Sequence, residues 1–173
     1  KADEAISVAG TINAGTNANV NAGSAVTISG DIAAANATLD AGTNVGFAGN
    51  LQASNKASLL ATANVLVGSG TIKAVTVYVN AGEDITQSGG TINATTANLR
   101  AEQNITQNAG SIAATTANMA SGANIEQSGG AITATNANLT AGQAIAQTNG
   151  SLVATNTVAK AGADLSLASA RNK

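Results

Sequence analysis

The sequence of 173 residues predicts an all-β fold, a parallel β-helix (β-solenoid) of the right-handed type with about 20 residues per coil. Two observations favour it: a short phrase recurs about every 20 residues through the chain, and apolar side chains within each unit alternate with the period of a strand. A third is that Phe47 and Tyr78 are the only aromatic residues, so the core has to be built from small and aliphatic side chains.

The repeat is clearest in columns of aliphatic and glycine residues. The first aliphatic column is Ile6, Val26, Val45, Val65, Ile85, Ile105, Ile125, Ile145 and Leu165. The glycine column that follows it is Gly10, Gly30, Gly49, Gly70, Gly90, Gly110, Gly130 and Gly150, and the second aliphatic column is Ile12, Ile32, Leu51, Ile72, Ile92, Ile112, Ile132 and Leu152. These columns predict one solenoid domain, residues 1–173, with eight full units, the start of a ninth and no distinct caps.

Each unit is predicted to contain three short strands. In the unit from Ile85 to Asn104 they cover about Ile85–Gln87, Thr91–Ala94 and Ala97–Ala101, with glycine-rich and asparagine-rich corners between them. Strands this short need partners, and the same strand of the next unit supplies one if the chain coils once per unit. With strands about 4.8 Å apart, the stack would be a rod on the order of 40 Å long.

Other repeat folds fit the period less well. Helical solenoids use units of about 33 to 47 residues, and left-handed hexapeptide coils favour multiples of six. Calcium-binding β-rolls need a third glycine and an aspartate after a pair such as Gly89-Gly90, and this chain has neither there. We therefore expect no calcium and no other metal.

Stacking turns each column into a line of equivalent side chains, and three polar lines are expected to form structural ladders. The column of Gln87, Gln107, Gln127 and Gln147 should point inward, because Val8, Ile28, Phe47, Val67 and Leu167 occupy the same place in other units. The second line is Asn98, Asn118 and Asn138, and the third, at the corner before the first strand of each unit, includes Asn104 and Asn124. Stacked amides can satisfy one another along such a line, and a ligand site lined by glutamine is the alternative interpretation.

The composition disfavours catalysis. The chain has no His and no Cys, only 9 % charged residues and a net charge of -2, so we expect no enzyme, no catalytic residues, no cofactor and no nucleic-acid partner. The acidic cluster of Glu83, Asp84 and Glu102, with Arg100 nearby, is interpreted as surface charge. No apolar run is long enough to span a bilayer as a helix, so membrane insertion is not expected.

The phrase from Asp84 to Ala94, followed by Ala97-Asn98-Leu99-x-Ala101, resembles the repeat regions of filamentous-haemagglutinin-like proteins, which are bacterial exoproteins exported by two-partner secretion. The resemblance covers essentially the whole chain. It implies a right-handed β-helix that serves as the shaft of a secreted or surface-attached adhesin, outside the cell, and it implies no active site.

The first functional hypothesis is therefore a non-catalytic, rigid extracellular shaft, with the rest of a larger exoprotein as its partner. The alternative is a self-assembling filament subunit, because Ile6-Ser7-Val8 and Leu165-Ser166-Leu167 match and identical chains could stack end to end. A minor alternative is an ice-binding solenoid, suggested by the threonine line of Thr95, Thr115, Thr135 and Thr155 beside Thr96, Thr116, Asn136 and Asn156.

Overall fold

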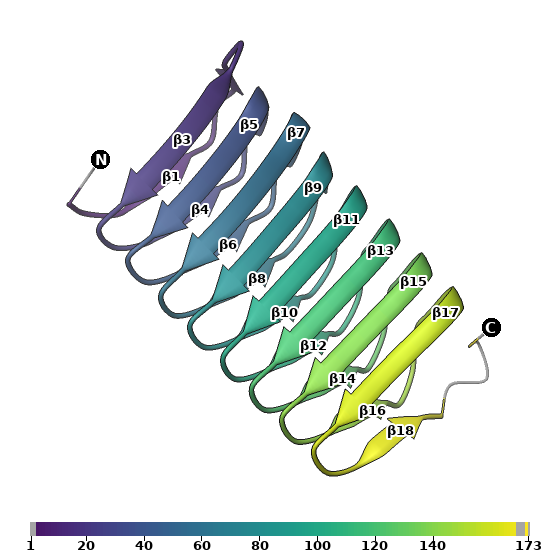
Figure 1. The fold of residues 1–173 in the computed structure, drawn as a ribbon. Coiled ribbons are helices and arrows are strands. Elements are labelled where there is room, and N and C mark those ends of the chain that lie inside the picture. Colours follow the sequence, from purple (N-terminus) through teal and green to yellow (C-terminus); the bar gives the residue numbers. More distant parts are fainter. Residues whose placement is uncertain (1–2, 169–171, 173) are drawn as a thin grey trace.

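A computed structural model describes residues 3–168 and residue 172 of the chain. This part of the chain contains eighteen β-strands and no helix. The strands wind into a single stack of coils, with the amino-terminal coil at one end and the carboxyl-terminal coil at the other (Figure 1). The chain is a parallel β-solenoid, as the sequence predicts.

One sheet collects the short strand of every coil, and we number coils 1 to 9 by these strands. All pairs are parallel, and the first aliphatic column is paired residue for residue, with Ile85 beside Val65 and Ile105. The strands are β1 (Ile6–Val8), β4 (Val26–Ile28), β6 (Val45–Phe47), β8 (Val65–Val67), β10 (Ile85–Gln87), β12 (Ile105–Gln107), β14 (Ile125–Gln127), β16 (Ile145–Gln147) and β18 (Leu165–Leu167).

The second sheet collects the rest of each coil. Its strands are β2 (Ile12–Asn13), β3 (Asn17–Ala22), β5 (Asp31–Ala41), β7 (Asn50–Ala61), β9 (Thr71–Ala81), β11 (Thr91–Ala101), β13 (Ser111–Ser121), β15 (Ala131–Ala141) and β17 (Ser151–Ala161). In coil 1 the two predicted segments are the separate strands β2 and β3, and both pair with β5. In later coils they join into one long strand whose pairing is interrupted part-way along, at Thr95 in β11. Three strand segments per coil are therefore confirmed.

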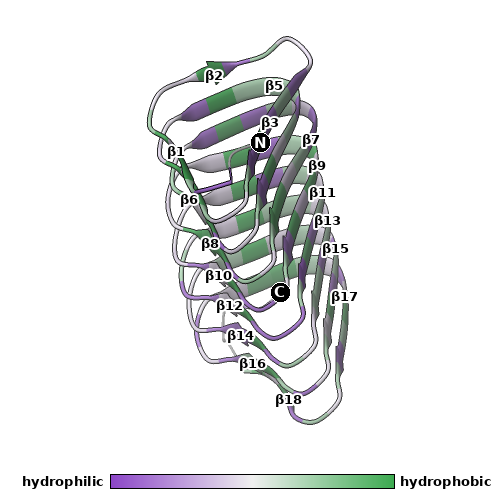
Figure 2. Ribbon diagram, turned by 90° about the vertical axis from the view of Figure 1, so that its left-hand side faces the viewer, coloured by the Kyte–Doolittle hydropathy of each residue, from purple (hydrophilic) through white to green (hydrophobic). Residues whose placement is uncertain are grey.

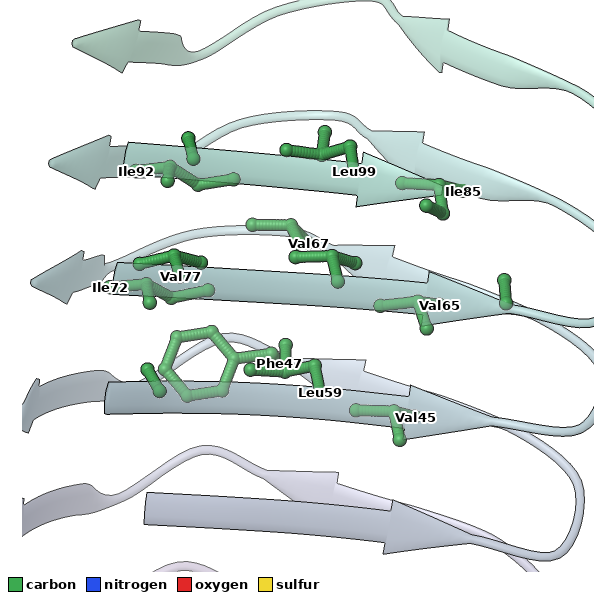
Figure 3. Packing of buried hydrophobic residues seen from close by; sticks show 14 of the residues in the cluster. Val45, Phe47, Leu59, Val65, Val67, Ile72, Val77, Ile85, Ile92 and Leu99 are labelled. Carbon is green, nitrogen blue, oxygen red and sulfur yellow. The ribbon is translucent and has the colours of Figure 1, made fainter. Parts of the chain in front are cut away.

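The core lies between the two sheets and consists of aliphatic layers, one per coil. In coil 5, Ile85 from the short strand and Ile92 and Leu99 from the long strand point into the same layer, and all three are buried (Figure 3). Buried and exposed positions alternate along the strands, and hydrophobic and hydrophilic residues alternate in the same way along the ribbon (Figure 2). Phe47, only 1 % exposed, places its ring in the layer of coil 3 beside Val45 and Leu59.

The period of about 20 residues is made up in two different ways. In coil 2, Ile28 and Ile32 are four positions apart, whereas in coil 4 the equivalent Val67 and Ile72 are five apart, so the turn gains a residue from coil 4 onward. That longer turn contains a glycine with positive φ in coils 4 to 8, at Gly70, Gly90, Gly110, Gly130 and Gly150. Coil 3 has the shorter turn and compensates with a bulge in the long strand, where the register shifts between Gln52 and Lys56.

Candidate functional sites: the polar ladders

The four glutamines form a buried ladder along the axis of the solenoid. Nε2 of Gln107 donates to Oε1 of Gln87 at 3.0 Å, Gln127 to Gln107 at 2.8 Å, and Gln147 to Gln127 at 2.7 Å. None of the four is more than 6 % exposed. An unpaired buried amide would cost about 1–3 kcal/mol, so each glutamine depends on the register of the coil beside it.

The same amides also connect the two sheets. Nε2 of Gln87 donates to the backbone carbonyl of Ser111 at 3.1 Å, and Nε2 of Gln127 donates to that of Ser151 at 3.1 Å. Each of these carbonyls lies at the start of the long strand of the next coil. The glutamine column therefore stabilises both the stacking of the short strands and the position of the long strand, which leaves little amide capacity for a ligand.

A second ladder runs on the outer surface of the long strands. Nδ2 of Asn118 donates to Oδ1 of Asn98 at 2.8 Å, and Asn138 donates to Asn118 at the same distance. The donor of each bond belongs to the later coil, so the ladder has a direction. At its amino-terminal end, Nδ2 of Asn98 has no hydrogen-bond acceptor among the described residues, and the next position in the column is Tyr78.

The third ladder follows the corner before each short strand. Its members are Asn44, Asn64, Asp84, Asn104 and Asn124. The backbone N–H and Nδ2 of Asn104 both donate to Oδ1 of Asp84, at 2.9 and 3.0 Å. Asn124 donates to Oδ1 of Asn104 in the same way, at 3.2 and 3.1 Å. Side-chain oxygens thus accept backbone donors that the corner would otherwise leave unpaired.

The acidic residues near this corner are engaged in similar contacts. Asp84 is a member of the corner ladder, and Glu83 accepts a hydrogen bond from Nδ2 of Asn64 at 3.1 Å. Glu102 binds the guanidinium of Arg100 at 2.7 Å, and both side chains are exposed. The hydrogen bond from Arg100 to Glu102, and then the attraction between their charges, raise the pKa of the guanidinium above its ordinary value. Within the described residues, no group of three or more acidic side chains has the arrangement of a metal site.

The threonine line lies where the long strand bends. Thr95, Thr115, Thr135 and Thr155 are exposed, and the positions of Thr95 and Thr115 are skipped by the ladder pairing. Their neighbours Thr96 and Thr116 are half-buried and belong to the next segment of the strand. The exposed threonines therefore form a single column along a bend.

Asn172 makes polar contacts that lie outside the three predicted ladders. Its Oδ1 accepts hydrogen bonds from Nε2 of Gln147 at 3.0 Å and from the backbone N–H of Leu152 at 2.9 Å, and its Nδ2 donates to Oε1 of Gln147. Asn172 is twenty positions after Leu152, so it stands where the second aliphatic column would continue. Extending that column by one period would have drawn attention to it.

Comparisons of the chain with protein-family models, with curated proteins and with solved structures gave no match. Among the residues that the structure describes, no helix has the length and hydropathy needed to cross a membrane.

Proposed function

We propose that this solenoid is a non-catalytic structural segment, the rigid shaft of a bacterial surface or secreted adhesin or fibre. The observation that supports this proposal is the uninterrupted register of the stack. From coil 4 onward every strand pairs with the equivalent strand of the next coil at a constant offset of twenty residues, without an inserted loop. Such a structure can be lengthened by adding coils, because each coil contacts only its neighbours.

The distribution of polar groups supports a structural role over a catalytic one. The glutamine amides, the corner asparagines and Asp84 all bind groups in adjacent coils. Glu83 accepts a hydrogen bond from Asn64, and Glu102 is paired with Arg100 at the surface. A general acid or base needs a reacting group within reach and a pKa suited to the task, and these carboxylates are instead occupied by structural contacts.

The extracellular location rests on the resemblance of the repeat phrase to filamentous-haemagglutinin-like exoproteins. It can be tested directly with antibodies raised against the chain. We expect them to label intact producing cells or to detect the protein in the culture medium. Detection only after the cells are lysed, with an intact-cell control for a known surface protein, would contradict the proposed location.

The shaft itself can be tested by changing the number of coils. Inserting four extra copies of residues 105–124 should lengthen the rod by about 19 Å in small-angle scattering, since strands stack about 4.8 Å apart. Deleting residues 105–124 should leave a folded, shorter rod, because Gln127 then follows Gln87 in the ladder. Deleting only residues 105–114, half a coil, is the matched control and should abolish cooperative unfolding. A shaft is ruled out if the whole-coil variants lose the fold as completely as the half-coil variant.

Head-to-tail filament formation is the second candidate, and the exposure of the terminal layers favours it. Leu165 is 50 % exposed, whereas Ile145, its equivalent in the preceding coil, is only 2 % exposed. Electron microscopy of the purified chain at micromolar concentration separates the two candidates. Uniform filaments with one subunit per roughly 40 Å would support stacking, and isolated short rods would exclude it.

A further inference from the structure

We infer that a cleft on the outer face of β7, β9 and β11 binds a carboxylate-bearing sugar, such as a uronic acid unit. The cleft has a volume of about 470 Å³. It is lined by Lys56, Ser58, Leu60, Tyr78, Val79, Asn80, Asn98 and Arg100. The three strands are neighbours in the sheet, so three successive coils contribute to one surface (Figure 1).

The cleft has more hydrogen-bond donors than acceptors. Nδ2 of Asn98 is the unpaired end of the outer asparagine ladder, in which every Nδ2 donates toward the preceding coil, so this donor faces the column position of Tyr78. Asn80, two residues after Tyr78 in β9, adds an exposed amide that makes no hydrogen bond within residues 3–168. The hydroxyl of Ser58, a residue only 2 % exposed, has no hydrogen-bond partner in the structure. A ligand rich in oxygen acceptors would satisfy the amides of Asn98 and Asn80.

The charges at the cleft favour an anion. The ammonium of Lys56 lies 5.1 Å from the centre of the Tyr78 ring and has no carboxylate partner in the described part of the chain. Arg100 stands at the other side of the cleft, where Glu102 uses part of its guanidinium. Asp40, in the column position of Leu60, accepts a hydrogen bond from Asn21 at 2.8 Å. The cleft therefore presents positive charge that is not fully compensated.

The backbone around the cleft favours a sugar over an extended peptide. A peptide that binds a sheet usually adds to an edge, where unpaired N–H and C=O groups are free. Here β9 is paired with β7 and β11 on both sides, so recognition has to come from side chains. Side-chain amides and hydroxyls suit the hydroxyls of a sugar ring, and a lysine suits its carboxylate.

The fluorescence of Tyr78 reports directly on binding at the cleft, because the chain has one Tyr and no Trp. We expect glucuronic acid at millimolar concentration to change the tyrosine fluorescence and to shift the side-chain amide signal of Asn98 in NMR spectra. Glucose and acetate carry only the ring or only the carboxylate. Each should bind at least about fivefold more weakly than glucuronic acid, because each lacks one part of the recognised group. An equal response to acetate, an equal response to glucose, or no response to glucuronic acid would each overturn the proposal.

Two pairs of variants separate the site from the fold. Lys56→Met should weaken glucuronic acid binding at least about fivefold, whereas Lys160→Met, on the same face but outside the cleft, should change it less than twofold. Asn98→Ala and Asn138→Ala both shorten the asparagine ladder by one member, at opposite ends, and only Asn98→Ala should weaken binding. Equal effects within either pair would show that the response comes from the fold and not from the cleft.

Discussion

Coils 1 to 4 and coils 5 to 8 fill the same inward column of the short strands in different ways. In the first group the column holds Val8, Ile28, Phe47 and Val67, and in the second it holds the four glutamines. The first group is also the less regular, since it contains the coil of nineteen residues and both register shifts of the long strand. Hydrocarbon contacts are non-directional and tolerate a change of turn length, whereas amide hydrogen bonds need donor and acceptor in fixed positions.

The largest expected loss of stability comes from the apolar inward column of coils 1 to 4. Phe47→Ala removes the largest buried side chain of the column, between Ile28 and Val67, and should lower the free energy of unfolding by about 3–5 kcal/mol. Urea unfolding followed by circular dichroism measures it. Tyr78→Ala is the control, since Tyr78 is 42 % exposed, and it should cost under about 1 kcal/mol. Equal costs for the two variants would show that the interior of coil 3 is not packed as described.

The next largest loss of stability is expected in the longer turn of the regular coils. Gly110 has a φ of 78°, and a Cβ there would lie 2.2 Å from the carbonyl oxygen of Gly89. Gly110→Ala should therefore cost about 2–3 kcal/mol in thermal or urea unfolding. At Gly46 in β6 the only neighbour of an added Cβ is the Thr27 hydroxyl at 3.9 Å, so Gly46→Ala should be neutral or slightly stabilising. An unchanged free energy of unfolding in Gly110→Ala would contradict the turn geometry.

A smaller effect concerns the glutamine ladder. Gln127→Leu leaves Oε1 of Gln107 and Nε2 of Gln147 without their ladder partners and should cost about 2 kcal/mol. Replacing all four glutamines by leucine should cost less than four times that amount, because few amides are then left unpaired and the column resembles that of coils 1 to 4. Additive costs, measured by urea unfolding of the single and quadruple variants, would argue against a cooperative ladder.

The smallest expected effect is a gain in stability at the buried hydroxyl of Ser121. The hydroxyl of Ser121 is buried and has no hydrogen-bond partner, and Ala101 and Ala141 occupy the same column in the coils on either side. Ser121→Ala should therefore raise the free energy of unfolding by up to about 1 kcal/mol, seen as a higher melting temperature. A lower melting temperature would mean that the hydroxyl has a partner in solution. Thr140→Ala, on the exposed side of the neighbouring strand, is the control and should change little.

Much of the fold follows from the spacing of residues in the sequence. A period of twenty with alternating apolar positions predicts the stack, the three strand segments and the inward orientation of Gln87 and its equivalents, because identical coils place identical columns in contact. The right-handed winding of the solenoid stays a prediction from the period. The hydrogen bond from Gln147 to Asn172 lies outside the predicted ladders, because Asn172 stands twenty positions after Leu152, where the repeat predicts an apolar residue.

The sequence alone determined the period, the columns and therefore which residues are neighbours along the axis, since repetition itself supplies the register. The tertiary structure decided how each period is divided between turn and bend, because an added residue in either gives the same coil length. It also decided which outward side chains share a surface. Lys56, Tyr78 and Asn98 belong to three coils and to two columns, and only the pairing of β7, β9 and β11 brings them around one cleft.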